Sequence, residues 1–272
     1  MPEDRLSEIA EFAEAENLFR IQDEAPEAVK TALGMASARI GGGVVLAMRN
    51  DPIGGCWNKA LGLGFTEPIT HGLIEEVCGF LRERGSPGAH LQIAPSVLPP
   101  DWDEIRAAHG LTAEDEWVKL VCPIEEFRHG ATELRVGPVD GPRAGEAASI
   151  FLRGFEMPEG ALSDMFATVV RLDGFGAFAA WDGDDMVANA YVLFNGEAAE
   201  LSGAATLRGH RNRGAQTALL GLRADAAAKA GCRWLVAETN LPPVGLANPS
   251  LNNMLRAGFR PLYTRRNWLW KP

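Results

Sequence analysis

The stretch LSGAATLRGHRNRGAQTA, residues 201–218, predicts a strand, a basic loop and the start of a helix. The strand is expected to end at Thr206 and the helix to begin at Gly214. A helix N-terminus presents unpaired N–H groups and the positive end of the helix dipole, so it is a natural place for a phosphate group. Glycine there lets the backbone approach a ligand closely, in conformations closed to other residues.

The side chains of the loop add to this pattern. Arg211 and Arg213 supply positive charge, and the Thr217 hydroxyl can donate a hydrogen bond. The loop stands out because the chain as a whole is acidic, with 26 Lys and Arg against 36 Asp and Glu and a net charge of −10. These residues alone leave two interpretations open: a phosphate-binding loop, or a solvated basic loop with a glycine at the helix N-cap.

The whole stretch resembles the cofactor-binding segment of the GNAT superfamily of N-acetyltransferases. In that family an Arg/Gln-x-x-Gly-x-Gly/Ala loop between a strand and a helix holds the pyrophosphate of acetyl-CoA. Here the loop reads Arg211-Asn-Arg-Gly214-Ala-Gln216, with Gln216 where the family usually has Gly or Ala. The strand WLVAET and a short helix ending in Gly258-Phe259 follow in the family's order. The resemblance is specific for residues 186–265 and extends from about residue 132.

The resemblance implies an α/β fold (a mixed, α+β sheet) made of two tandem GNAT-like domains, each with a central, mostly antiparallel sheet flanked by helices. Residues 131–272 are expected to form the acetyl-CoA-binding domain. Residues 1–130 contain no Arg-x-x-Gly-x-Gly segment, but the strand HLQIAP and a short helix ending in His109-Gly110-Leu111 suggest a degenerate copy of the same fold.

Hydrophobic periodicity and turn residues predict alternating helices and strands along the chain. Hairpin turns are expected at residues 182–185 and 195–196. A helix is expected over Pro26–Ala38 and a long strand over Glu197–Thr206. Two final strands are expected over Arg260–Arg265 and Asn267–Lys271.

Transfer of an acyl group from a thioester to an amine needs a base, because an aliphatic amine is mostly protonated at neutral pH. Glu200 is the best candidate, since it lies on the strand that leads to the loop and has apolar neighbours. A solvent-facing strand glutamate is the competing interpretation, and Glu238 is the second choice as base. For the thiolate proton, many relatives use a tyrosine at the position of Met254, so Ser250 or bulk water is expected to act instead.

The resemblance also assigns the cofactor contacts. Backbone N–H groups of the strand end would polarise the thioester carbonyl and pair with the pantetheine arm, and the loop and short helix would hold the rest. The expected cofactor-binding residues are Ala204, Ala205, Thr206, Leu207, Arg211, Arg213, Gly214, Ala215, Gln216, Thr217, Asn248 and Asn253.

Composition excludes several other classes. The acidic balance disfavours nucleic-acid binding, which relies on a basic face. The longest apolar runs are far shorter than a membrane span, and the acidic stretch MPEDRLSEIAEF does not suggest an export signal. The four cysteines and five histidines form no metal-ligand spacing, so we expect no bound metal. Four cysteines without a pairing pattern are typical of a reducing compartment, so we expect a cytoplasmic location.

The leading hypothesis is therefore an N-acetyltransferase that uses acetyl-CoA and acetylates a primary amine of a small molecule, with a homodimer possible. A non-catalytic acyl-CoA-binding sensor or scaffold is the alternative. A third hypothesis keeps the enzyme but makes the acceptor a protein N-terminus or lysine.

Overall fold

A computed structural model describes residues 3–272, which form two compact units. The first unit contains the residues up to Lys119 together with Leu262–Pro272, and the second contains Leu120–Pro261. The expected domains, 1–130 and 131–272, divide the chain differently. The difference arises because two long strands, β5 (Thr112–Pro123) and β12 (Arg260–Trp270), each begin in one unit and end in the other.

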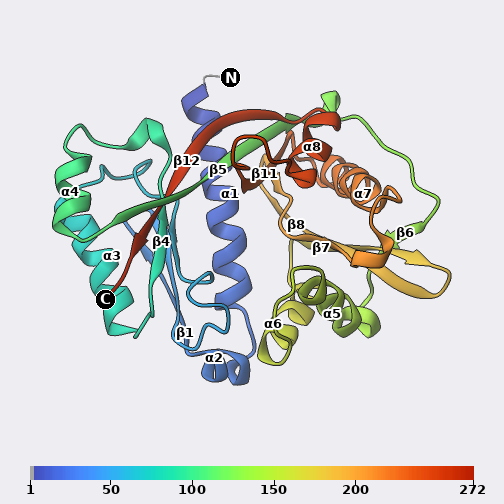
Figure 1. The fold of residues 1–272 in the computed structure, drawn as a ribbon, viewed down its shortest axis with the longest axis horizontal. Coiled ribbons are helices and arrows are strands. Elements are labelled where there is room, and N and C mark those ends of the chain that lie inside the picture. Colours follow the sequence, from blue (N-terminus) through green and yellow to red (C-terminus); the bar gives the residue numbers. More distant parts are fainter. Residues whose placement is uncertain (1–2) are drawn as a thin grey trace. The chain divides into compact units, whose positions relative to one another are not determined.

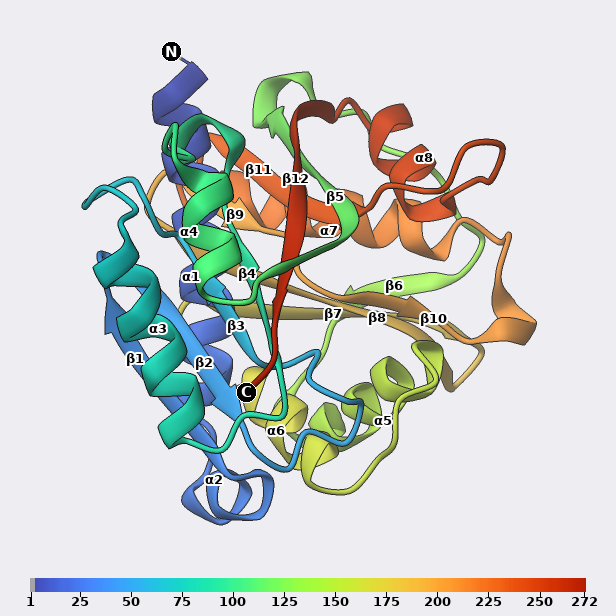
Figure 2. The same ribbon diagram turned by 60° about the vertical axis from the view of Figure 1, so that its left-hand side comes forward.

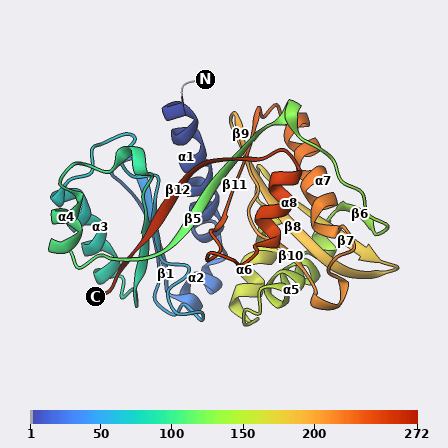
Figure 3. The ribbon, with the colours of Figure 1, turned by 45° about the horizontal axis from the view of Figure 1, so that its top comes forward.

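In the first unit the strand order is β1-β2-β3-β4-β12-β5. Helix α1 covers one face of this sheet, and α3 and α4 cover the other (Figure 2). Figure 3 shows β12 running beside β5. The other elements of this unit are α1 (Glu3–Asp23), α2 (Glu27–Leu33), β1 (Met35–Ile40), β2 (Gly43–Met48), β3 (Lys59–Leu61), α3 (His71–Glu83), β4 (Ala89–Gln92) and α4 (Trp102–Ala108).

Alternation along β2 explains the two-sided core of the first unit. Successive strand residues point to opposite faces. Val44 and Leu46 accordingly pack with Ala15 of α1, whereas Val45 and Ala47 belong to the core formed with α3. All six residues of β2 are buried, so the strand is central to the unit.

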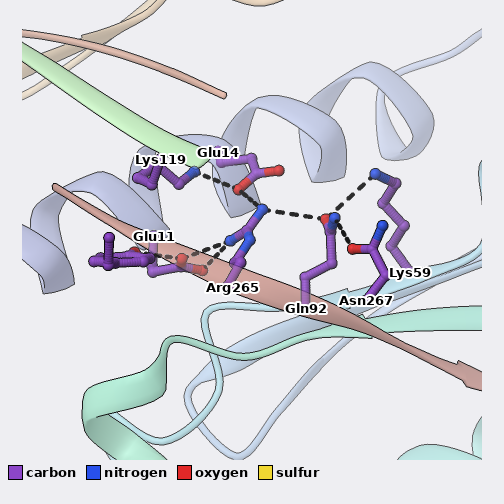
Figure 4. A network of polar contacts seen from close by, with 8 residues as sticks. Glu11, Glu14, Lys59, Gln92, Lys119, Arg265 and Asn267 are labelled. Carbon is purple, nitrogen blue, oxygen red and sulfur yellow. Dashed lines mark hydrogen bonds and ion pairs between the residues drawn. The ribbon is translucent and has the colours of Figure 1, made fainter. Parts of the chain in front are cut away.

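A buried ionic network crosses the α1 side of the first unit (Figure 4). The guanidinium of Arg265, on β12, donates hydrogen bonds to Glu11 and Glu14 of α1 at 2.5 to 2.6 Å. Lys119 of β5 donates to the same Glu14 carboxylate at 2.5 Å, and Gln92 accepts from Arg265 at 3.2 Å. Burial favours the neutral form of the Glu14 carboxyl, but Arg265, Lys119 and Lys59 outweigh it and lower its pKa to about 2.

In the second unit the strand order is β5-β11-β9-β8-β7-β6, and β10 pairs with β8. Helices α5 and α6 pack on one face of β7 and β8, and α7 packs on the other (Figure 1). The elements are β6 (Arg135–Pro138), α5 (Ala144–Gly154), α6 (Ala161–Val169), β7 (Phe175–Asp182), β8 (Asp185–Asn195), β9 (Ala198–Glu200), β10 (Ala204–Thr206), α7 (Ala215–Lys229), β11 (Trp234–Asn240) and α8 (Pro249–Arg256).

The hairpin turns expected around residues 182–185 and 195–196 are confirmed, because they join β7 to β8 and β8 to β9. The single strand expected over Glu197–Thr206 is wrong. It is broken between β9 and β10 by a β-bulge: Glu200 lies opposite Leu193, but Ala204 lies opposite Ala190, so one extra residue is inserted.

Two further expectations are corrected. The helix expected over Pro26–Ala38 ends at Leu33, because Gly34 adopts a left-handed conformation (φ 62°) and the chain continues as β1. The two final strands are one strand, β12, which continues through Asn267. Within this strand, the buried side-chain amide of Asn267 accepts from Gln92 at 2.6 Å and donates to Asp115 at 2.8 Å.

Candidate functional site

The second unit contains a cavity of about 730 Å³. Its wall is made from the end of α5, strand β10, the basic loop, the start of α7 and one face of α8. The lining residues are Gly154, Phe155, Ala204, Ala205, Thr206, His210, Arg211, Asn212, Gly214, Ala215, Gln216, Thr217, Pro249, Asn253 and Arg256. Nine of the twelve expected cofactor-binding residues are among them.

Gly214 places an open helix start on this wall. It adopts a left-handed conformation (φ 78°), and an added Cβ would lie 2.4 Å from the carbonyl oxygen of Ala131. Among the described residues, no side chain caps the N-terminus of α7. The first N–H groups of α7 are therefore available to a ligand, and the helix dipole favours an anionic one.

The corresponding helix of the first unit begins differently. The Thr70 hydroxyl accepts a hydrogen bond from the N–H of Leu73 at 3.2 Å, so α3 is capped by its own chain. An anion at the start of α3 would have to displace this cap. Within the described chain, the start of α3 therefore offers a ligand fewer unpaired N–H groups than the start of α7.

The arginines of the loop have distinct partners. Arg211 donates to the carbonyl oxygens of Thr206 (3.2 Å) and Gly154 (3.4 Å), which connects the loop to β10 and α5. Arg213 forms an ion pair with Asp182 through two hydrogen bonds (2.5 and 3.1 Å) and lies outside the cavity lining. The hydrogen bond and charge of Arg213 lower the pKa of the Asp182 carboxyl.

Gln216 joins α7 to α8. Its side-chain amide donates to the Ser250 hydroxyl at 3.1 Å and accepts from the Asn253 amide at 2.7 Å. Gln216, which stands where the GNAT motif usually has Gly or Ala, is thus hydrogen-bonded to two other predicted site residues. Asn248 lies just before them and caps α8 through the N–H groups of Ser250 and Leu251. Asn248, Ser250 and Leu207 are not lining residues of the cavity.

Glu200, the expected base, lies in β9 and is fully buried, outside the cavity lining. Its carboxylate interacts with the buried guanidinium of Arg223 from α7. Glu238, the second choice, is in β11 and also lies outside the lining. Met254, the position at which the family resemblance implies a tyrosine in many enzymes, is buried and has no proton to donate.

Sequence reasoning missed six lining residues, Gly154, Phe155, His210, Asn212, Pro249 and Arg256. Two of them, His210 and Asn212, lie in the loop quoted above. Gly154 and Phe155 carry no local signal, because they reach the cavity only through the packing of α5 against β10. Arg256 is a cation on the α8 face and could be recognised from its spacing of three from Asn253.

Residues 3–272 contain no helix long and apolar enough to cross a membrane. The part of the chain that the structure describes also shows no group of three or more His, Cys, Asp or Glu that could hold a metal ion.

No protein-family model matches the sequence, and no curated protein matches it by sequence. Solved structures resemble it at low identity. A tandem GNAT protein from the clavulanic acid biosynthesis pathway has a TM-score of 0.58 at 15% identity, over 94% of this chain and 93% of that one. A GCN5-related N-acetyltransferase from Kribbella flavida has a TM-score of 0.58 at 15% identity, over 90% and 93%.

An acetyltransferase of the GNAT family from Colwellia psychrerythraea has a TM-score of 0.53 at 12% identity, over 98% of this chain and 97% of that one. The chain therefore has the GNAT fold in a tandem arrangement, as the sequence predicts, and the expected mixed α/β class is confirmed.

Proposed function

We propose that this tandem GNAT fold is an acyltransferase whose second unit binds acetyl-CoA in the cavity and acetylates a primary amine of a small molecule in a ternary complex. The observation that carries the proposal is the uncapped start of α7 at Gly214, placed on the same cavity wall as β10. A helix start suits a pyrophosphate, and a strand edge suits the amide-containing pantetheine arm.

The cavity suits such a ligand in size and polarity. Its volume of about 730 Å³ lies within the usual range for small-molecule sites, about 300–1,000 Å³. Among residues 3–272, β10 pairs with β8 alone, so its other edge offers backbone donors and acceptors. Arg256 adds a cationic group to the wall, and His210 adds an imidazole that can form hydrogen bonds.

When bound, acetyl-CoA supplies a thioester that an amine can attack. Backbone N–H groups on the open edge of β10 are the proposed donors to the carbonyl oxygen, where negative charge develops. Ser250 is the proposed proton donor: its hydroxyl accepts from Gln216, which leaves its own hydrogen able to be donated. Glu200 remains the proposed base, and its burial beside Arg223 makes its role the first to test.

A thermal-shift titration tests the cofactor. Acetyl-CoA at about 100 times its Kd adds about 2.7 kcal/mol to the free energy of unfolding, which raises the Tm by several degrees. ATP and NAD serve as controls. A rise with acetyl-CoA alone supports the proposal, and the same protein is then screened with small amines for release of free CoA. An equal rise with ATP, or none with any ligand, contradicts it.

A non-catalytic acyl-CoA sensor is the second candidate, favoured by the buried Met254 and by the position of Glu200 away from the cavity. The two functions differ in turnover. A sensor binds acetyl-CoA and releases no CoA with any amine, whereas the enzyme releases CoA with at least one. If CoA is released with a peptide amine but with no small amine, the acceptor is a protein.

A further inference from the structure

The β-bulge between β9 and β10 determines which strand borders the cavity. β9 pairs with β11 on one side up to Glu200, and the N–H of Leu201 still bonds to Val236 at 2.8 Å. After the extra residue, β10 pairs with β8 in a shifted register, and within the described chain it has no pairing with β11. The bulge is thus the point at which the chain leaves its pairing with β11.

The bulge interrupts the regular hydrogen bonds between the strands, so the backbone N–H and C=O groups at the bulge need other partners. The Tyr191 N–H bonds to the Gly203 carbonyl at 3.1 Å, and the carbonyl oxygens of Tyr191 and Ser202 lie within reach of a side chain of α7. A buried carbonyl without a donor is costly, so a bulge inside a core persists only when something satisfies it.

Arg223 supplies that donor from α7. Its side chain is buried, with 1% of its surface exposed. Nη1 donates to the Tyr191 carbonyl at 3.1 Å and reaches the Ser202 carbonyl at 3.5 Å, and Nε donates to the Leu219 carbonyl of its own helix at 3.1 Å. One guanidinium therefore touches both sides of the bulge.

Glu200 provides the charge that this buried cation needs. Burial lowers the pKa of Arg223 to about 9, and the nearby Glu200 carboxylate acts in the opposite direction. Glu200 is itself the last residue of β9 before the bulge. A buried cation is tolerated when hydrogen bonds and an opposite charge offset the loss of water, and Arg223 has hydrogen bonds to three carbonyl oxygens and the electrostatic influence of Glu200.

We propose that Arg223, with Glu200 as its counterion, is a positioning residue that holds the bulge and thereby keeps the edge of β10 open to the pantetheine arm of an acyl-CoA. The proposal rests on the proposed function, because an open β10 edge matters to activity only if that arm lies along it. It assigns Arg223 no contact with the ligand, and Arg223 is not a lining residue of the cavity.

The test compares two ligands on purified full-length chain. Acetyl-CoA carries the pantetheine arm, whereas 3′-phosphoadenosine 5′-diphosphate carries the nucleotide and both bridging phosphates without it. Arg223→Met removes all side-chain N–H donors at this position. Arg223→Lys keeps a positive charge near Glu200 but lacks the several N–H groups of the guanidinium. Leu220→Ala is the matched control, because Leu220 is equally buried on α7 and its loss also lowers stability.

We expect Arg223→Met to weaken acetyl-CoA binding at least tenfold in calorimetry and to leave the nucleotide fragment within about twofold of wild type. Arg223→Lys should be intermediate, and Leu220→Ala should change neither affinity. Hydrogen exchange at the amides of residues 201–206 should rise in Arg223→Met and stay unchanged in Leu220→Ala. This second readout does not depend on any ligand, and the lysine variant replaces the methionine variant if the latter does not fold.

The outcomes separate the two proposals. If wild-type protein binds neither ligand, the proposed function fails. If wild type binds acetyl-CoA but Arg223→Met binds it as Leu220→Ala does, with the same exchange at residues 201–206, then Arg223 is only a stabilising core residue and the inference is overturned.

Discussion

Gly214 is the residue on which the cofactor proposal depends most directly. Its φ of 78° and the 2.4 Å distance from an ideal Cβ to the Ala131 carbonyl oxygen leave no room for any side chain without a shift of the loop. We expect Gly214→Ala to weaken acetyl-CoA binding at least tenfold, and Gly214→Glu to abolish it because a carboxylate also repels phosphate. Isothermal calorimetry measures both.

Gly209 provides a control in the same loop. Its φ is not in the left-handed region, and an added Cβ would meet open space among the described residues. Gly209→Ala should therefore bind acetyl-CoA within about twofold of wild type. Wild-type affinity in Gly214→Glu would show that the ligand does not lie at the start of α7.

Glu200 is either a base or only the counterion of Arg223, and one substitution distinguishes the two. Glu200→Gln removes a buried charge, so we expect lower stability in either case. If Glu200 is the base, acetyl-CoA affinity is kept, kcat falls by at least tenfold and the acid limb of the pH–rate profile disappears.

Turnover within about threefold of wild type, a difference under about 1 kcal/mol in barrier height, would leave Glu200 with a structural role alone. The sequence singles out both Gly214 and Glu200, and the structure places Gly214 on the cavity wall and Glu200 away from it. Gly214 is part of a local motif, whereas the surroundings of Glu200 depend on Arg223, which is 23 residues away on another element.

The hydrogen bonds of Gln216 connect helix α7 to helix α8. Gln216→Met keeps the side-chain length but removes both bonds, to Ser250 and Asn253. Each is worth about 1 kcal/mol, so we expect acetyl-CoA to bind about three- to thirtyfold more weakly. Calorimetry on the variant checks this, and an unchanged Kd would show that α8 is held by other contacts.

Local sequence patterns predicted most elements of the second unit but not the break between β9 and β10. The stretch AAELSGAAT is apolar enough for one strand, and Gly203 could equally be a strand glycine. Gly203 is required because an added Cβ would lie 2.4 Å from the ring of Phe151 on α5, a contact made by tertiary packing. Likewise, the buried Asn267 amide within β12 bonds to Gln92 and Asp115, which are more than 150 residues away in the sequence.

The two units differ in the starts of their corresponding helices, so we expect one acetyl-CoA site per chain. The start of α7 is open at Gly214, whereas α3 is capped by Thr70. Calorimetry should give a stoichiometry of one. Two equivalents, with the second lost in a variant of the first unit, would contradict the assignment of that unit as a degenerate copy.

Acid should destabilise the first unit through Glu14. Its pKa is about 2 in the folded protein and 4.5 without the fold, so its contribution to stability is complete above pH 4.5 and is lost as pH falls from 4.5 to 2. The loss amounts to about 3 kcal/mol near pH 2, and about 2 kcal/mol of it has occurred by pH 3. Urea unfolding between pH 7 and pH 3 measures this part of the loss.

Glu14→Gln is the control for this pH dependence. The variant should be less stable at pH 7, because Lys119 and Arg265 lose a shared carboxylate, but its stability should fall less steeply toward pH 3. An equal slope in both proteins would place the acid sensitivity elsewhere.

The ionic network of Figure 4 also imposes an order on folding during synthesis. Glu11 and Glu14 leave the ribosome early, but the guanidinium that contacts both follows about 250 residues later. At about 5–20 residues per second, the two carboxylates wait roughly 10 to 50 seconds for it. Until then the sheet of the first unit also lacks β12. The first unit is thus begun before the second on the ribosome but completed only after the second has been made.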